Sequence, residues 1–138
     1  MNNKRYKLDL HLKNYITKEL YNYEFNVNKL KEIQDDILYS SGSNSDGQPK
    51  GNKKVNVVEQ KAEKLIESRT VLIITRKIQN IKAALKKLDE EEQEIVDLIF
   101  FKGNTQVYLQ MHNNISKDQY YNIKNKMIYL TAREYGEI

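Results

Sequence analysis

Residues 88–136 decide the fold, and they read LDEEEQEIVDLIFFKGNTQVYLQMHNNISKDQYYNIKNKMIYLTAREYG. The stretch predicts three helices. The first begins with Asp89 as N-cap and Glu92 three residues later, which is the pattern of a capping box, and Gly103 lies past its end as a C-cap. One side of this helix is apolar, at Ile95, Leu98, Ile99 and Phe101.

A polar turn joins the second and third predicted helices. The second is short, at about residues 105–111, and it stops in the run HNN at 112–114. Asparagine tolerates the left-handed backbone conformation that a tight turn between helices needs. The third helix begins with Ser116 as N-cap and Gln119 at the third helical position, a second capping box. Its apolar residues recur at steps of three and four and are Tyr120, Ile123, Met127 and Leu130.

This spacing leaves polar side chains facing outward at the start of the third helix: Lys117, Asp118, Gln119, Tyr121, Asn122, Lys124 and Asn125. A helix–turn–helix reads DNA with this part of its second helix. The alternative is an ordinary helical domain, in which a short helix, a polar turn and a longer helix have no such role. DNA binding is favoured because glutamine, asparagine, lysine and tyrosine pair with bases and phosphates, and because the Glu/Lys ladder of a plain surface helix is missing.

The same segment resembles region 4 of bacterial sigma factors, with an acidic LDEEEQEIVDL helix and ISKDQYYNIKNKM at the place of the recognition helix. The whole chain resembles the ArpU/RinA-type phage late-transcription regulators. The matching pieces are the KRYKLDL start, the NYITKELYNYEFNVNKLKEIQDDIL helices, a polar interruption, a long central helix and the C-terminal helix–turn–helix. The resemblance implies a phage or prophage transcriptional regulator that controls late genes and makes a sigma-like contact with RNA polymerase.

One position departs from the usual helix–turn–helix pattern. The small residue usual before the turn falls on Gln110, and the usual apolar position falls on Asn113. The departure predicts a turn one residue longer than standard.

Composition limits the class of protein. The chain of 138 residues suits one domain with an appendage, and one proline and five glycines favour an all-α fold. The apolar runs are short, such as VLII at 71–74, so no membrane partner is expected. There is no cysteine and no apolar secretory segment at the N-terminus, which predicts a cytoplasmic protein of a bacterial host cell.

The formal net charge of +4 is unevenly distributed. Residues 50–87 carry eleven basic and three acidic residues, whereas residues 88–104 carry one and six. Since basic side chains bind phosphates, we expect part of the central segment to follow the DNA backbone beside the reading helix. The acidic run 89–92 is interpreted as a helix start, with a contact to a basic partner such as RNA polymerase as the alternative.

The remaining chain predicts three parts. Residues 1–39 form a helical hairpin, with helices at about 9–23 and 26–39, and residues 40–55 form a flexible linker because SSGSNSDGQPKGNKK has no periodicity. Residues 56–138 form a long helix followed by the helix–turn–helix DNA-binding domain. Asn56 and Glu59 match a capping box at the start of the long helix.

The long helix carries an apolar seam at positions 71, 74, 78, 81, 85 and 88, which alternate in steps of three and four. Around TVLIIT, at 70–75, this seam coincides with a second stripe, so burial on several sides is expected there. The seam has two interpretations. It packs against the hairpin and the C-terminal domain, or it mediates self-association as a homodimer.

The predicted binding residues fall into two groups, and the partner expected for both is double-stranded DNA. Base-facing residues are Lys117, Gln119, Tyr121 and Asn122, with Asn125 beside them. Phosphate-facing residues are Lys124, Lys126 and Arg133 on the third helix and Lys82, Lys86 and Lys87 on the central segment.

No enzyme, cofactor or metal is expected. His11 and His112 stand alone, without a metal-ligand spacing, and the glycines form no phosphate-binding loop. Two rival functions stay open, namely a phage DNA-packaging subunit of the small-terminase type and a helical adaptor that binds a protein without touching DNA.

Overall fold

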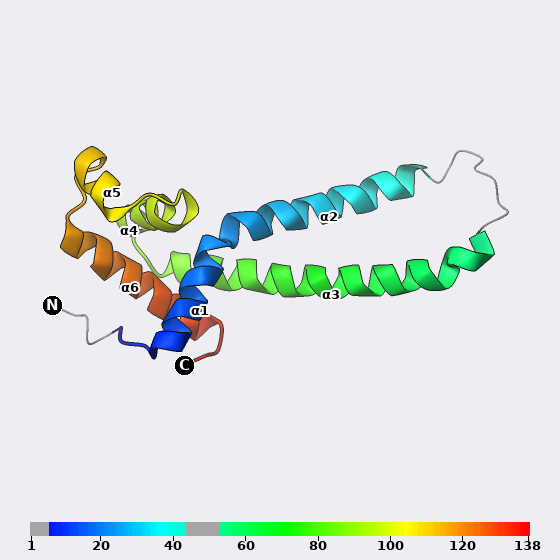
Figure 1. Cartoon of the computed structure of the whole chain (residues 1–138), viewed down its shortest axis with the longest axis horizontal. Coiled ribbons are helices and arrows are strands. Elements are labelled where there is room, and N and C mark those ends of the chain that lie inside the picture. The colour runs from blue at the N-terminus through cyan, green and yellow to red at the C-terminus, as the bar shows by residue number, and fades with distance from the viewer. Residues whose placement is uncertain (1–5, 44–52) are drawn as a thin grey trace. The chain divides into compact units, whose positions relative to one another are not determined.

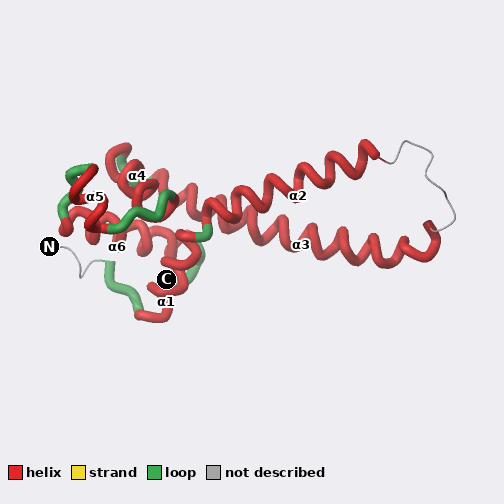
Figure 2. Tube along the Cα trace, turned by 45° about the horizontal axis from the view of Figure 1, so that its top comes forward, coloured by secondary structure: helices red, strands yellow, loops and turns green. Residues whose placement is uncertain are grey.

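The computed structural model describes residues 6–43 and 53–138, and it describes the side chains of residues 6–36 and 68–138. This part of the chain contains no strand, which confirms the all-α class (Figures 1 and 2). The elements are α1 (Leu10–Tyr21), α2 (Tyr23–Ser43), α3 (Lys53–Lys86), α4 (Glu90–Val96), the π-helical turn η2 (Asp97–Phe101), α5 (Gln106–His112) and α6 (Lys117–Glu134). Over the described residues, none of these helices has the length and apolar character needed to cross a membrane.

The chain divides into two compact units, and each is described by itself. The first unit comprises the residues up to Glu24 together with Lys77–Ile138, and the second is Phe25–Arg76. This division differs from the predicted one, which assigns α1 to an N-terminal hairpin domain. Helix α1 instead packs with α6 and η2, because Ile16 and Leu20 are buried in the same core as the C-terminal helices.

The boundaries between 39 and 56 also differ from the prediction. Helix α2 continues to Ser43 and α3 begins at Lys53, so the predicted linker 40–55 is helical at both ends. Residues 44–52 lie outside the described residues. Asn56 is the fourth residue of α3, and the prediction that it caps this helix is therefore wrong. Lysine is a good helix former, which allows the helix to begin before the best capping residue.

The core of the first unit consists of a few buried side chains from each of several helices. Its buried residues include Ile81, Ala84 and Leu88 around the end of α3, Ile99 and Phe100 in η2, and Met127, Ile128 and Ala132 in α6. The seam of α3 is therefore used for packing within the chain from Ile81 onward, as the first interpretation predicted.

The expected burial around TVLIIT is wrong for two residues. Ile74 is buried, but the neighbouring Leu72 and Ile73 are mostly exposed. Successive residues of a helix point in different directions, and the chain covers only the side of α3 that carries Ile74.

Helix α4 begins as predicted. The Glu92 N–H donates to Asp89 Oδ1 at 2.8 Å and the Asp89 N–H donates to Glu92 Oε1 at 3.2 Å, so the capping box is complete. The helix then widens into η2, where the Lys102 N–H donates to the Asp97 carbonyl. The wider π-helical turn changes the directions in which its own side chains point. Phe100 is buried, whereas Phe101, which the sequence predicted on the apolar side, is half-buried. Gly103 follows with a positive φ of 66°, as expected for a C-cap glycine.

Candidate nucleic-acid interface

Four residues, 113–116, separate α5 from α6. Asn114 has a φ of +56°, which confirms that an asparagine takes the left-handed conformation in this turn. Ile115 is buried, and its N–H donates to the Leu109 carbonyl at 3.2 Å. The turn is thus attached to the core by one backbone hydrogen bond and one side chain. Its four residues lie within the three to four that usually join such helices.

Both helices beside the turn are capped by hydroxyl side chains. The Tyr108 N–H donates to Thr105 Oγ1 at 3.1 Å, and the Gln119 N–H donates to Ser116 Oγ at 3.1 Å. These bonds satisfy backbone donors that the first turn of a helix leaves without a partner. The start of α6 is therefore fixed at Lys117 by its cap and by the buried Ile115 before it.

Helix α6 has an inner and an outer face. Tyr120, Ile123 and Met127 are buried as predicted, and Leu130 is half-buried. Burial also includes Ile128, Thr131 and Ala132, which the spacing of apolar residues did not predict. The outer face exposes, in the first turns of the helix, Lys117, Asp118, Tyr121 and Asn122. The structure therefore places three of the four residues predicted to face bases on one exposed surface.

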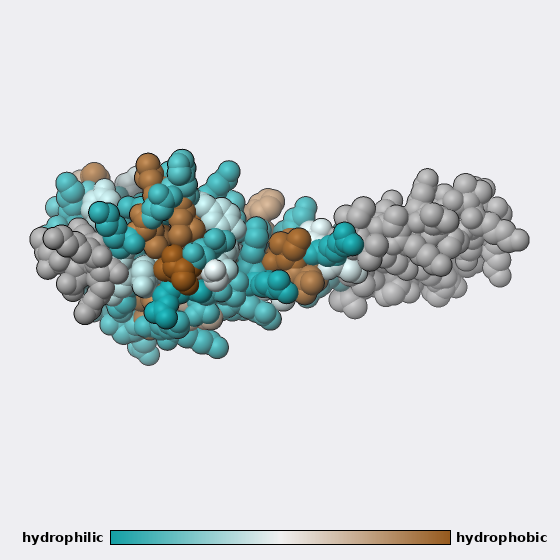
Figure 3. Space-filling view, turned by 90° about the horizontal axis from the view of Figure 1, so that it is seen from below, coloured by the Kyte–Doolittle hydropathy of each residue, from teal (hydrophilic) through white to brown (hydrophobic). Residues whose placement is uncertain are grey.

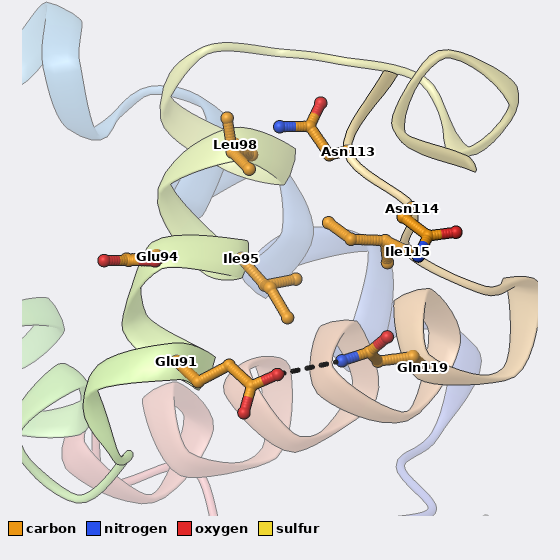
Figure 4. Close-up of a pocket in the computed structure, with 8 residues that line it drawn as sticks. All are labelled: Glu91, Glu94, Ile95, Leu98, Asn113, Asn114, Ile115 and Gln119. Atoms are coloured by element: carbon orange, nitrogen blue, oxygen red, sulfur yellow. Dashed lines mark hydrogen bonds between the residues drawn. The ribbon is translucent and has the colours of Figure 1, made fainter. Parts of the chain in front are cut away.

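Gln119 has a different position from the other three. It is half-buried, and its Nε2 donates to Glu91 Oε1 of α4 at 3.5 Å (Figure 4). The Ser116 cap is present, but the side chain of Gln119 lies toward α4 instead of returning to the Ser116 N–H as a capping box requires. The residue is thus held by an acidic group at the edge of the exposed surface.

A cavity of about 240 Å³ lies between α4, the turn and the start of α6. Its lining combines carboxylates, amides and apolar groups from Glu91, Glu94, Ile95, Leu98, Asn113, Asn114, Ile115 and Gln119, and Figure 4 shows Glu91 and Gln119 pointing toward one another. The cavity is smaller than the roughly 300–1,000 Å³ typical of sites for drug-sized ligands. Its carboxylates repel a phosphate, so phosphates are not expected on this side of α6.

Lys126 is bound within the protein. Its Nζ donates to Glu92 Oε2 at 2.9 Å, and this hydrogen bond raises the pKa of the Lys126 ammonium above its usual range. The predicted phosphate contact therefore competes with an ion pair that joins α6 to α4. Lys124 lies near two aromatic rings, with its Nζ 5.4 Å from the Tyr120 ring centre and 5.9 Å from that of Tyr21.

The predicted phosphate-facing residues do not form one cluster. Arg133 is exposed, but it is 16 residues after Lys117 on the same helix, a separation of about 24 Å at 1.5 Å per residue. Lys87 pairs with Glu134 at 2.7 Å and therefore lies at the same far end of α6. Lys82 and Lys86 are exposed and precede it by no more than about one and a half helical turns. These three lysines thus lie near the C-terminal end of α6, not beside its first turns.

Asn125, which the sequence predicted beside the base-facing residues, is half-buried on α6, one turn after the exposed pair Tyr121 and Asn122.

The residue that sequence reasoning missed at this surface is Glu91, which is 28 positions before Gln119. No local pattern links two residues so far apart, whereas the caps and the turn follow from neighbouring residues.

No protein-family model, curated protein or solved structure matches this chain.

Proposed function

We propose that this protein is a DNA-binding transcriptional regulator of the phage or prophage type, which contacts the major groove through α5, the turn at 113–116 and α6. The observation that carries the proposal is the exposed start of α6. Lys117, Tyr121 and Asn122 project from a helix whose opposite face, with Tyr120 and Ile123, is fixed in the core. A helix with an exposed polar N-terminal surface is the element that a helix–turn–helix places in the major groove of DNA.

The exposed residues suit distinct contacts. The Asn122 amide carries a donor and an acceptor that match the N6 and N7 groups of adenine. Lys117, at the positive end of the helix, suits a phosphate or a guanine. The Tyr121 ring suits a thymine methyl group, and its hydroxyl suits a phosphate. Gln119, held by Glu91, is proposed to contact a base only after it leaves that carboxylate.

Acidic residues near the start of α6 affect selectivity. Asp118 is exposed on the helix itself, and Glu91 lies next to Gln119. Carboxylates close to the DNA lower non-specific affinity because they oppose the phosphate charge. We propose that binding depends on correct base contacts more strongly than binding by a uniformly basic helix does.

The proposal is tested by fluorescence-anisotropy titration of duplexes tiled across the protein's own genomic neighbourhood. We expect one or more duplexes to bind selectively. The double variant Tyr121→Ala/Asn122→Ala should lose roughly 10-fold or more in affinity for them, since each base contact contributes about 1–3 kcal/mol of discrimination. The matched control is Asn14→Ala, which removes an exposed asparagine from α1 and should leave affinity unchanged. Equal binding by wild type and the double variant would contradict the proposal.

A helical adaptor is the second candidate, and a specific surface favours it. Helix α5 exposes Val107, Tyr108 and Met111, the last of them to 75%. Residues 103–116 contain no lysine, arginine, aspartate or glutamate. Exposed apolar groups on a surface without charges are typical of protein contacts, and RNA polymerase is the partner that the family resemblance suggests.

The two candidates predict opposite outcomes for two variants. For an adaptor, Met111→Glu abolishes partner capture while Asn122→Ala has no effect. For a DNA reader, Asn122→Ala weakens site-selective binding. A packaging subunit of the small-terminase type is distinguished by assembly, because it requires a ring-sized oligomer instead of a monomer or dimer.

A further inference from the structure

In the unit Phe25–Arg76, few of the described side chains are buried. In it, α2 and α3 run in opposite directions and diverge toward the end of α2 and the start of α3 (Figures 1 and 2). Among its described side chains, those of residues 25–36 and 68–76, Ile74 alone is buried. The apolar stripe of α2, formed by Val27, Leu30 and Ile33, is only half-buried.

Three larger apolar side chains of the same unit are mostly exposed. Phe25 is 65% exposed, Leu72 58% and Ile73 56%. Figure 3 shows hydrophobic surface on α3 where it adjoins the grey atoms. Helices in proteins owe most of their stability to packing of apolar side chains, so exposed apolar side chains of this kind favour a partner.

The free surface is not the part of the seam that packs in the first unit. Ile81 and Leu88 lie in the core of that unit and are covered by its own helices. Leu72 and Ile73 belong to a different stretch of α3, in the second unit.

We infer that the second unit binds a second copy of this chain, with α2 and α3 of each copy packed together as an antiparallel four-helix bundle. Charge supports this choice of partner. Within the unit, α2 from residue 25 to 43 carries two basic and three acidic residues, a net charge of −1. The α3 residues 53–76 carry six basic and three acidic residues, a net charge of +3.

Two-fold symmetry makes these opposite charges complementary. In an interface between identical copies, any contact between one surface and another occurs twice. When α2 of one copy lies along α3 of the other, both contacts pair a negative helix with a positive one. DNA fits this face less well, because exposed leucine, isoleucine and phenylalanine side chains gain nothing from a phosphate backbone.

The length of the helices in this unit also fits a dimer interface. Helix α2 has 21 residues, a length of about 31 Å at 1.5 Å per residue. A standard interface buries about 800 Å² per partner, which favours a surface formed by two helices of this length over a smaller one. The exposed group on α5 is limited to three side chains of one seven-residue helix, so a stable dimer is less suited to that surface.

The inference is tested by sedimentation equilibrium of the full chain over a wide concentration range. We expect wild type to dimerise and Leu72→Gln/Ile73→Gln to raise the dimer dissociation constant roughly 100-fold or more, because four apolar side chains per dimer are no longer there to be buried. Glutamine keeps the helix propensity high, and circular dichroism of both proteins checks that the fold is unchanged. The matched control is Val107→Gln/Met111→Gln on α5, which should dimerise like wild type.

A charge variant tests how the helices pair. Arg69→Glu/Arg76→Glu reverses two exposed charges of α3 and should weaken a dimer in which α3 faces the negative α2. A tighter dimer would show that α3 faces α3 and would overturn the arrangement. A wild-type protein that stays monomeric at all concentrations would overturn the inference itself, and so would a dimer that loses stability only in the α5 variant.

Discussion

At the scale of single residues, the central feature of the first unit is a buried carboxylate with two partners. Glu19 of α1 is 7% exposed, and it accepts from Lys77 Nζ at 3.0 Å and from the Tyr135 hydroxyl at 3.2 Å. A buried charge costs free energy unless it is paired and hydrogen-bonded, and here both conditions are met. The three residues therefore join α1, the C-terminal part of α3 and the C-terminal end of the chain.

Removing this carboxylate should destabilise the first unit. Glu19→Ala is expected to lower the free energy of unfolding by about 2 kcal/mol, since it leaves the Tyr135 hydroxyl without its partner. Urea denaturation measures the change. The control is Glu24→Ala, an exposed glutamate, for which a change below about 0.5 kcal/mol is expected. Equal effects of the two substitutions would show that Glu19 has no special role.

Tyr135 makes the free energy of unfolding depend on pH in the alkaline range. Burial, followed by the charge of Glu19, raises the pKa of the Tyr135 hydroxyl well above its ordinary value. A raised pKa means that the folded state holds the proton more tightly than the unfolded state. The stabilisation is therefore fully present below about pH 10, the unfolded value, and it is lost as the pH rises above it. The loss of unfolding free energy between about pH 9 and about pH 11 should be smaller in Tyr135→Phe, and an identical pH profile would contradict this assignment.

At the scale of elements, the turn between α5 and α6 holds the proposed reading helix in place. Asn114 adopts a left-handed conformation, which costs an ordinary L-residue about 1–2 kcal/mol and glycine almost nothing. Ile115 and the Ser116 cap then fix where α6 begins. The geometry of the first turns of α6 therefore depends on this backbone conformation.

Substitutions at Asn114 separate backbone conformation from side-chain chemistry. Asn114→Gly should leave the free energy of unfolding within about 0.5 kcal/mol of wild type, whereas Asn114→Val should lower it by roughly 1–2 kcal/mol. Thermal and urea denaturation of both variants provide the measurement. If valine were tolerated as well as glycine, the turn would not be under the conformational constraint assigned to it.

At the scale of the whole molecule, interactions between residues that are close in the sequence could be predicted, whereas contacts between distant residues could not. The capping box at Asp89, the left-handed asparagine and the buried stripe from Tyr120 to Met127 each depend on residues within one or two helical turns. These are the interactions for which spacing along the chain determines spacing in the fold.

The corrections come from contacts between distant residues. Gln119 and Glu91 are 28 positions apart, Lys126 and Glu92 are 34 apart, and Tyr135 and Glu19 are 116 apart. No periodicity relates such pairs, and for that reason the sequence alone assigns Lys126 to phosphates, whereas its partner in the fold is a glutamate. The packing of α1 on α6, in place of the expected hairpin, has the same origin.

Salt dependence tests the role assigned to Lys82, Lys86 and Lys87. Lys82 and Lys86 are exposed, and Lys87 lies near the C-terminal end of α6 through its ion pair with Glu134. If they bind phosphates, the variant Lys82→Gln/Lys86→Gln/Lys87→Gln should flatten the slope of log affinity against log salt by roughly 0.9 for each phosphate that these lysines neutralise. An unchanged slope would leave DNA binding to α6 and the turn alone.

The most direct test of the central claim is NMR mapping of backbone amide shifts on addition of a selectively bound duplex. A reading helix predicts that the largest changes fall on residues 116–122, with smaller changes along the exposed face of α6 toward Asn125. Binding through another surface would leave these amides unchanged while shifting those of α3 or of the acidic start of α4. That result would contradict DNA reading by α6, whereas shifts centred on Lys117, Tyr121 and Asn122 would confirm it.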